Sequence, residues 1–118
     1  MNLDELSNQI SKVSSEKVVQ NLSRLLLEWK ENKKTAEELK DEIERYIGNT
    51  WIENNEDHKK IYQMWSSFRD KAISEIGGMT MNERLYLFGL FKYFDACTSE
   101  KDKLPVYRKL HANPSLKS

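Results

Sequence analysis

Apolar residues recur every three or four positions along most of this chain, which is the spacing of one face of an α-helix. In the first 30 residues they form two stripes, one of Leu3, Leu6, Ile10 and Val13 and one of Val18, Leu22, Leu25 and Trp29. At about 100° per residue, the two stripes point roughly 120° apart. The pattern favours a break or strong bend near Ser14 and Ser15, although one long helix that contacts two partners also fits it.

Two capping boxes mark helix starts further along the chain. Thr35 and Glu38 can each bond the other's backbone N–H group, and Thr80 and Glu83 repeat this arrangement. We expect Gly48 to end the helix that Thr35 begins, because glycine readily adopts the left-handed conformation that closes a helix.

The region between the capping boxes holds the most regular amphipathic stripe. Asn55 is followed by two acidic residues, which oppose the positive end of a helix dipole and so predict a helix start. The stripe keeps its phase up to Gly77-Gly78 and consists of Ile61, Trp65, Phe68, Ala72 and Ile76. A last helix is predicted to begin at Ser99 or Asp102, with Pro105 in its first turn and with four side chains facing inward, Leu104, Val106, Tyr107 and Leu110.

Residues 85–94 are apolar on nearly every side, so periodicity alone does not separate a buried strand from a buried helix. A strand needs a partner, and no other segment has the β-branched alternation to provide one. We therefore expect a central helix over about residues 81–97. The predicted fold class is all-α, a compact single-domain bundle of five to six helices over residues 1–113, followed by a flexible C-terminal tail at 114–118.

The composition fits one such domain. The chain has 118 residues, of which 38% are hydrophobic and 32% charged, and no stretch approaches the roughly 18 apolar residues that would span a bilayer. The acidic start has neither the basic region nor the apolar run of a secretory signal. The single cysteine, Cys97, cannot form an internal disulfide, which favours a reducing compartment. We expect a cytoplasmic protein that does not bind membranes.

Few residues offer catalytic or metal-binding chemistry. Cys97 could act as a nucleophile, with His111 or His58 as base and Asp95 to orient it, but a free cysteine after so apolar a run is usually a small buried hydrophobe. A loose divalent-ion site is conceivable at Glu53, Glu56, Asp57 and His58. Acidic residues at a helix start need no metal to explain them, however. We expect no enzymatic activity, no cofactor and no metal.

Charge is uneven along the chain, although 19 basic and 19 acidic residues balance overall. From Glu28 to Asp57, ten acidic residues stand against five basic ones. An acidic helix beside exposed aromatic side chains can bind a basic partner, since charge steers the approach and the aromatic rings anchor it. The predicted partner-binding residues are Trp29, Glu38, Asp41, Glu42, Tyr46 and Trp51. A solvated helix face over core aromatic residues is the other interpretation.

The C-terminal segment has the opposite bias, with five basic residues against one acidic residue from Lys101 to Ser118. Lys103, Arg108 and Lys109 could contact phosphates, so a nucleic-acid-associated regulator is the alternative function. A helix-turn-helix would need a polar recognition helix, which the pattern lacks. A solvated basic tail at the negative end of the last helix explains the charges more simply.

These patterns favour a small helical protein–protein interaction module that binds and modulates or neutralises a partner protein. Inhibitors and bacterial-type immunity-like or antitoxin-like proteins work in this way. We also expect a homodimer, because one core of this size rarely covers both apolar stripes of the first 30 residues.

Overall fold

The computed structural model describes residues 1–112, of which 74% are helical and none lies in a strand. Seven α-helices occur in this part of the chain: α1 Leu3–Ser11, α2 Lys17–Glu28, α3 Ala36–Asn49, α4 Asn55–Phe68, α5 Met81–Phe88, α6 Phe91–Asp95 and α7 Glu100–Lys109. Short 3₁₀ turns at Trp29–Glu31 and Ile76–Gly78 and a π-helical turn at Arg69–Ile73 extend some of them. The all-α prediction is confirmed, with more helices than the five to six expected.

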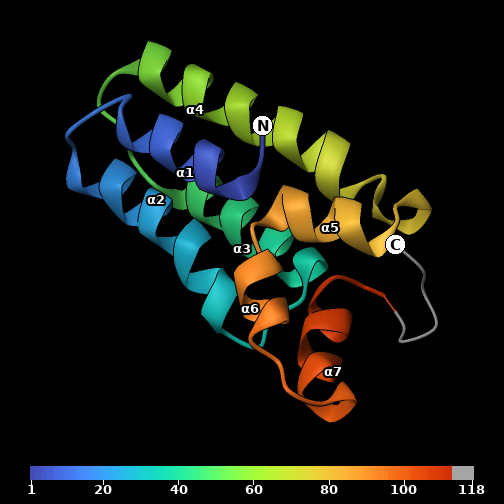
Figure 1. Ribbon diagram of the computed structural model, residues 1–118. Helices are drawn as coiled ribbons and strands as arrows, with labels where there is room; N and C mark the ends of the chain where they lie inside the picture. Colours follow the sequence, from blue (N-terminus) through green and yellow to red (C-terminus); the bar gives the residue numbers. More distant parts are fainter. Residues whose placement is uncertain (113–118) are drawn as a thin grey trace.

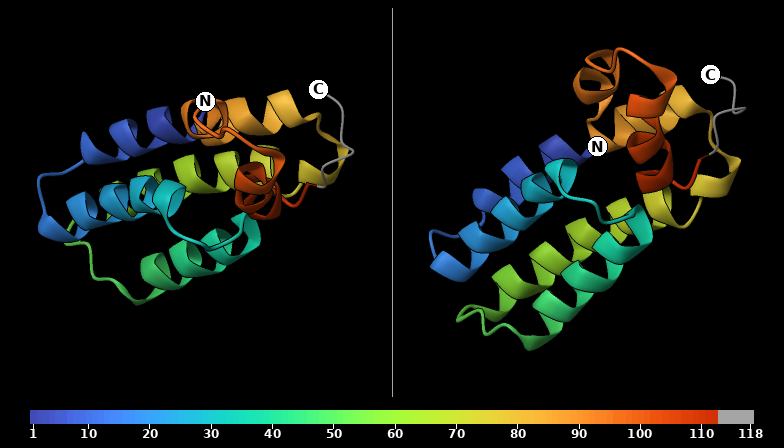
Figure 2. Two further views of the ribbon diagram at one scale, coloured as in Figure 1. Left: turned by 60° about the horizontal axis from the view of Figure 1, so that its bottom comes forward. Right: turned by 90° about the horizontal axis from the view of Figure 1, so that it is seen from below.

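Helices α1 to α4 form an elongated body, and α5 to α7 lie at one end of it (Figures 1 and 2). Helix α1 packs against α2 and α4, and α2 also packs against α3. The molecule measures 46 × 24 × 20 Å along its principal axes. No helix within residues 1–112 is both long enough and apolar enough to cross a bilayer. The tail expected at 114–118 lies outside the described residues.

The break expected near Ser14 and Ser15 is confirmed, because α1 ends at Ser11 and α2 begins at Lys17. The chain reverses there, so that both segments face one core. Their buried apolar residues are Leu3, Leu6, Ile10, Val19, Leu22, Leu26 and Trp29. The stripe of α2 is offset from the expected one, since Val18 and Leu25 are only half-buried. Intramolecular packing covers both stripes, which removes the observation from which a homodimer was predicted.

Side-chain caps begin most of the helices at the expected positions. Both capping boxes form, at the start of α3 with Thr35 and at the start of α5 with Thr80. Ser99 caps α7 and accepts a hydrogen bond from the N–H of Asp102 at 3.2 Å. Three features differ from the expectation. Helix α3 continues past Gly48, and Pro105 lies in the middle of α7 rather than in its first turn. Helix α4 ends at Phe68 and passes into the π-helical turn instead of continuing to Gly77-Gly78.

The expected central helix over residues 81–97 is not confirmed, because Gly89 divides it. Gly89 adopts φ = 66° and ψ = 36°, and the N–H of Leu90 donates to the carbonyl of Leu85 at 2.9 Å, which closes α5 in a Schellman-type turn. The shorter α6 that follows has no buried residue, and Phe91 is 41% exposed. Phe88, before the turn, is fully buried. Leu90, directly after the turn, is still buried, so the apolar run continues into α6 while its burial ends at Phe91.

Candidate functional site

A cleft of about 1140 Å³ opens between α6, α7 and the connection from α2 to α3. The segment 30–33, Leu90, Tyr93 and eight residues between Lys101 and Ala112 line it. The ammonium of Lys30 lies 5.7 Å from the ring centroid of Tyr93, so the first two parts of the lining are in contact. We call this hollow the α6–α7 cleft. The orange and red helices that contribute to it, α6 and α7, lie at one end of the molecule (Figure 2).

Lys109 fixes α7 to the α2–α3 connection. Its ammonium donates to the carbonyls of Asn32 at 2.7 Å and Lys34 at 2.8 Å, and lies 4.1 Å from the ring centroid of Trp29. Lys109 is only 6% exposed, and this burial lowers its pKa to about 8, while the charge of Glu38 acts in the opposite direction. The ammonium of Lys109 therefore holds two segments together instead of presenting a charge to solvent.

Further bonds extend this attachment on both sides of Lys109. The guanidinium of Arg108 donates to the carbonyl of Lys33 at 2.9 Å. The Nε2 atom of His111 accepts a hydrogen bond at 3.1 Å from the N–H of Glu37, in the first turn of α3. Because these contacts join residues more than 70 positions apart in sequence, one wall of the cleft is held firmly in place.

Buried Arg84 on α5 bonds to the backbone at the end of α7. Its Nη1 atom donates to the carbonyls of Leu110 at 2.9 Å and His111 at 2.8 Å, which α7 leaves without helical partners. The residue is 3% exposed, and burial lowers the pKa of its guanidinium. The end of α7 is thus anchored both to α5 and to the α2–α3 connection.

Other parts of the lining expose apolar side chains. Tyr93 on α6 is 39% exposed and Leu104 on α7 is 47% exposed. The rings of Phe94 and Tyr107 meet edge to face at 5.7 Å between centroids, which holds α6 against α7. The cleft therefore offers apolar surface to solvent on a supported framework.

The rim of the cleft is positively charged. Lys33, Lys101 and Arg108 are exposed, and within residues 1–112 no carboxylate lies within ion-pair distance of any of them. Lys30 does pair with Asp4 at 2.7 Å, and Glu31 is the one acidic residue in the lining. The cations of the rim are therefore only weakly compensated.

The predicted acidic residues do lie together on α3. Glu38, Asp41 and Glu42 surround a shallow hollow of about 250 Å³, which Lys34 and Arg45 also line. Lys34 pairs with Glu42, so part of the negative charge is already compensated within the chain.

The aromatic residues predicted to accompany them do not join this surface. The prediction that Trp29 is exposed is wrong: it is fully buried, and its indole N–H donates to the carbonyl of Thr35 at 3.1 Å. Tyr46 is half-buried, and its hydroxyl donates to the carbonyl of Val18 at 2.6 Å. Trp51 is 80% exposed but follows the far end of α3, whose 14 residues span about 20 Å.

The three predicted phosphate-binding cations point to different partners. Lys103 lies 5.1 Å from the ring centroid of Phe94, whereas Arg108 contacts the α2–α3 connection and Lys109 is buried. Only Arg108 of the three is an exposed residue. The structure does not bring these cations together into one surface.

The structure also shows where the residues considered for metal binding and for nucleophilic chemistry lie. No three side chains of His, Cys, Asp or Glu in residues 1–112 are grouped so that they could hold a metal ion, and this includes the segment 53–58. Cys97 is half-buried rather than buried, and its thiol lies 3.4 Å from the carbonyls of Tyr93 and Asp102. These contacts link α6 to the start of α7.

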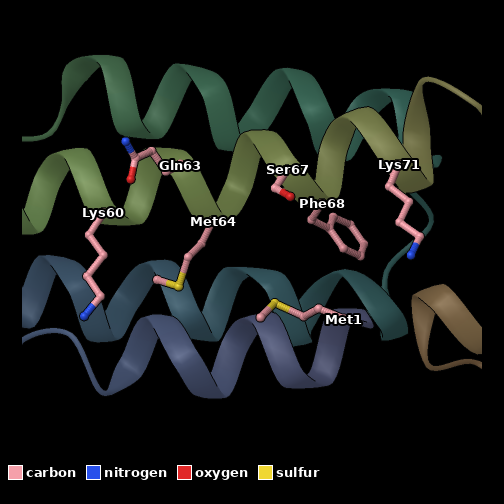
Figure 3. Close-up of a pocket in the computed structure, with 7 residues that line it drawn as sticks. All are labelled: Met1, Lys60, Gln63, Met64, Ser67, Phe68 and Lys71. Atoms are coloured by element: carbon pink, nitrogen blue, oxygen red, sulfur yellow. The ribbon is translucent and has the colours of Figure 1, made fainter.

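A smaller hollow of about 290 Å³ lies beside α4 (Figure 3). Met1, Met64 and Phe68 supply its apolar lining, whereas Lys60 and Lys71 lie toward its two ends. Because its cations do not converge and its volume is much smaller, it is a weaker candidate than the α6–α7 cleft.

No protein-family model matches the chain, and neither a curated protein nor a solved structure shows significant similarity to it.

Proposed function

We propose that this chain is a small protein-binding module that docks a partner protein in the α6–α7 cleft and modulates it by covering part of its surface. The observation that carries the proposal is the cleft itself, about 1140 Å³ in volume, in which exposed Tyr93 and Leu104 lie beside cations that are only weakly compensated. Protein interfaces commonly combine apolar anchors at the centre with a charged rim. This combination favours the cleft over the acidic surface of α3, which lacks adjacent anchors.

The firm attachment of α7 also supports binding. Lys109, Arg108 and His111 hold α7 against the α2–α3 connection, so one wall of the cleft keeps its shape before a partner arrives. A preformed surface loses less conformational entropy on association, which favours affinity.

The alternative function, a nucleic-acid-associated regulator, has less support. A phosphate-binding surface needs several exposed cations that face one backbone. Here Lys109 is buried against the α2–α3 connection and Lys103 lies against Phe94, which leaves only Arg108 exposed. An electrophoretic shift assay with mixed DNA and RNA at about 50 mM salt tests this alternative, because low salt favours even nonspecific electrostatic binding.

The proposed function is tested by capture from a lysate of cells that naturally produce the protein, followed by mass spectrometry. Leu104→Glu places a charge in the cleft, whereas Leu27→Glu makes the same change at a leucine of similar exposure on α2, 43% against 47%. We expect a protein retained by the parent chain and by Leu27→Glu to be lost from Leu104→Glu.

A third variant examines the acidic surface of α3. It combines Glu38→Lys, Asp41→Lys and Glu42→Lys. Loss of the captured protein from this variant, together with its retention by Leu104→Glu, would assign docking to α3 and refute the cleft. Circular dichroism of every variant establishes that the helices are intact.

A further inference from the structure

We infer that the partner segment received by the α6–α7 cleft is an acidic amphipathic helix, an inference that rests on the proposed function. The cleft presents three exposed cations, Lys33, Lys101 and Arg108, around apolar side chains. A ligand that fits must bring carboxylates to the rim and large apolar side chains to the floor.

Charge complementarity selects an acidic ligand. Lys33 and Arg108 are neighbours, since Arg108 donates to the carbonyl of Lys33, whereas Lys101 lies near the start of α7. None of the three forms an ion pair with a carboxylate of the described chain, and Glu31 is the one acidic residue in the lining. A basic or neutral ligand would leave these charges uncompensated at the interface, and like charges across an interface disfavour binding.

The secondary structure selects a helical ligand. An extended peptide usually binds by adding a strand to the edge of a sheet, and residues 1–112 contain no strand. A groove between helices more commonly receives a helix, whose apolar residues three or four positions apart enter the groove. The space between α6 and α7 provides such a groove, with Tyr93 and Leu104 available for contact.

A second copy of this chain fits the cleft poorly. The exposed residues of its acidic helix, α3, are polar or glycine, for instance Glu37, Glu38, Asp41 and Gly48. The exposed apolar residues Leu27, Trp51 and Tyr62 lie on other segments. The acidic helix α3 therefore offers carboxylates to the rim but no apolar anchors beside them.

Selection from a displayed library of random peptides of about 15 residues, long enough for several helical turns, tests the inference. The immobilised targets are the parent chain, Leu104→Glu and the matched control Leu27→Glu. We expect the parent and the control to enrich sequences rich in Asp and Glu, with large apolar residues three or four positions apart. Leu104→Glu should not enrich them.

Charge reversal then tests the role of the rim. The pair Lys33→Glu and Lys101→Glu should weaken binding of an enriched peptide about tenfold or more at about 50 mM salt, with a smaller loss at high salt. The pair Lys60→Glu and Lys71→Glu on α4 and its π-helical extension changes the net charge equally but lies outside the cleft, so it should leave affinity nearly unchanged.

The outcomes separate this inference from the proposed function. Cleft-dependent enrichment of neutral or basic peptides, or equal effects of the two charge-reversed pairs, would overturn the acidic helix while leaving protein docking in the cleft. No cleft-dependent enrichment would also overturn it, and the lysate capture would decide the proposed function separately. A light-scattering mass of at least twice 14.0 kDa for the parent, with the mass of a single chain for Leu104→Glu, would identify a second copy as the occupant.

Discussion

Lys109 illustrates how far the environment of one residue can depart from its sequence pattern. A lysine near the end of a predicted helix, among other basic residues, is normally solvated. Here the α2–α3 connection covers it, and Trp29 and two backbone carbonyls surround its ammonium. Nothing within the C-terminal segment indicates these partners, because they lie about 75 residues earlier in the chain.

Burial of Lys109 predicts an unusual pH dependence of stability. Its pKa in the folded chain is lowered to about 8, whereas lysine in an unfolded chain titrates near 10.4. Between these values the unfolded chain binds more protons than the folded one, so its contribution to the free energy of unfolding rises with pH. We expect Lys109→Met to remove this rise between about pH 8 and pH 10 in denaturant titrations.

An exposed lysine serves as the control for this measurement. Lys60→Met, on the solvent side of α4, should retain the rise in stability that the parent chain shows. If the parent and Lys109→Met responded identically to pH over this range, the lowered pKa of Lys109 would be wrong.

Two phenylalanines of the same apolar run differ in their expected contribution to stability. Phe88 is fully buried, with ring centroids 5.3 Å from Trp29 and 5.6 Å from Phe68, so Phe88→Ala should lower the free energy of unfolding by about 3–5 kcal/mol. Phe91 is 41% exposed, so Phe91→Ala should cost about 1 kcal/mol or less. Chemical denaturation measures both, and equal losses would restore the continuous central helix that the sequence suggested.

At the scale of the helices, local signals predict much of the structure. The capping boxes at Thr35 and Thr80 need only residues within one turn, and both form as expected. The break between α1 and α2 follows from a change in the phase of apolar residues, which is also local. The end of α5 was missed because apolar residues continue on both sides of Gly89, and only its left-handed conformation reveals the turn.

The glycines at two helix ends predict opposite effects of the same substitution. At Gly89, φ is positive and an added Cβ would lie 2.5 Å from Oδ2 of Asp4, so Gly89→Ala should cost roughly 1–2 kcal/mol for the left-handed conformation, with a further loss from the contact. Gly48 lies inside α3 with open space around it, so Gly48→Ala should raise the free energy of unfolding by about 0.5–1 kcal/mol. The midpoints of thermal or chemical unfolding of the two variants should therefore shift in opposite directions from that of the parent chain. A stabilised Gly89→Ala protein would show that the turn has another conformation.

At the scale of the whole molecule, the sequence predicts the fold class but not the α6–α7 cleft. Leu104 was expected to face inward with Tyr107, yet Leu104 is exposed and Tyr107 is buried. The difference arises because α7 packs at the end of the bundle, where it contacts α6 on one side and the α2–α3 connection on another (Figure 1). One side of α7 therefore stays uncovered, and that side cannot be chosen from helical periodicity alone.

For the acidic surface of α3, too, the sequence pattern predicts local proximity but not burial by distant parts of the chain. The charges of Glu38, Asp41 and Glu42 are neighbours on one helix, so their proximity could be read from the sequence. The burial of Trp29 could not be read from the sequence, because the residues that contact it come from three separate parts of the chain, Thr35, Phe88 and Lys109. Of the six residues predicted to bind a partner, the three acidic ones lie together on α3, whereas the three aromatic ones do not join them.

The contact between Ser7 and Ser23 bears on the order in which the molecule assembles. Each hydroxyl donates to the carbonyl of the other residue, at 2.9 and 2.8 Å, where α1 and α2 pack against each other. The two residues are only 16 positions apart, so closing this hairpin loses less chain entropy than joining α7 to the α2–α3 connection across 75 residues. We therefore expect α1 and α2 to associate before the folding transition state and the α6–α7 cleft to form after it. Within residues 1–112, the α6–α7 cleft would then be the last part to fold and, on unfolding, the first to open.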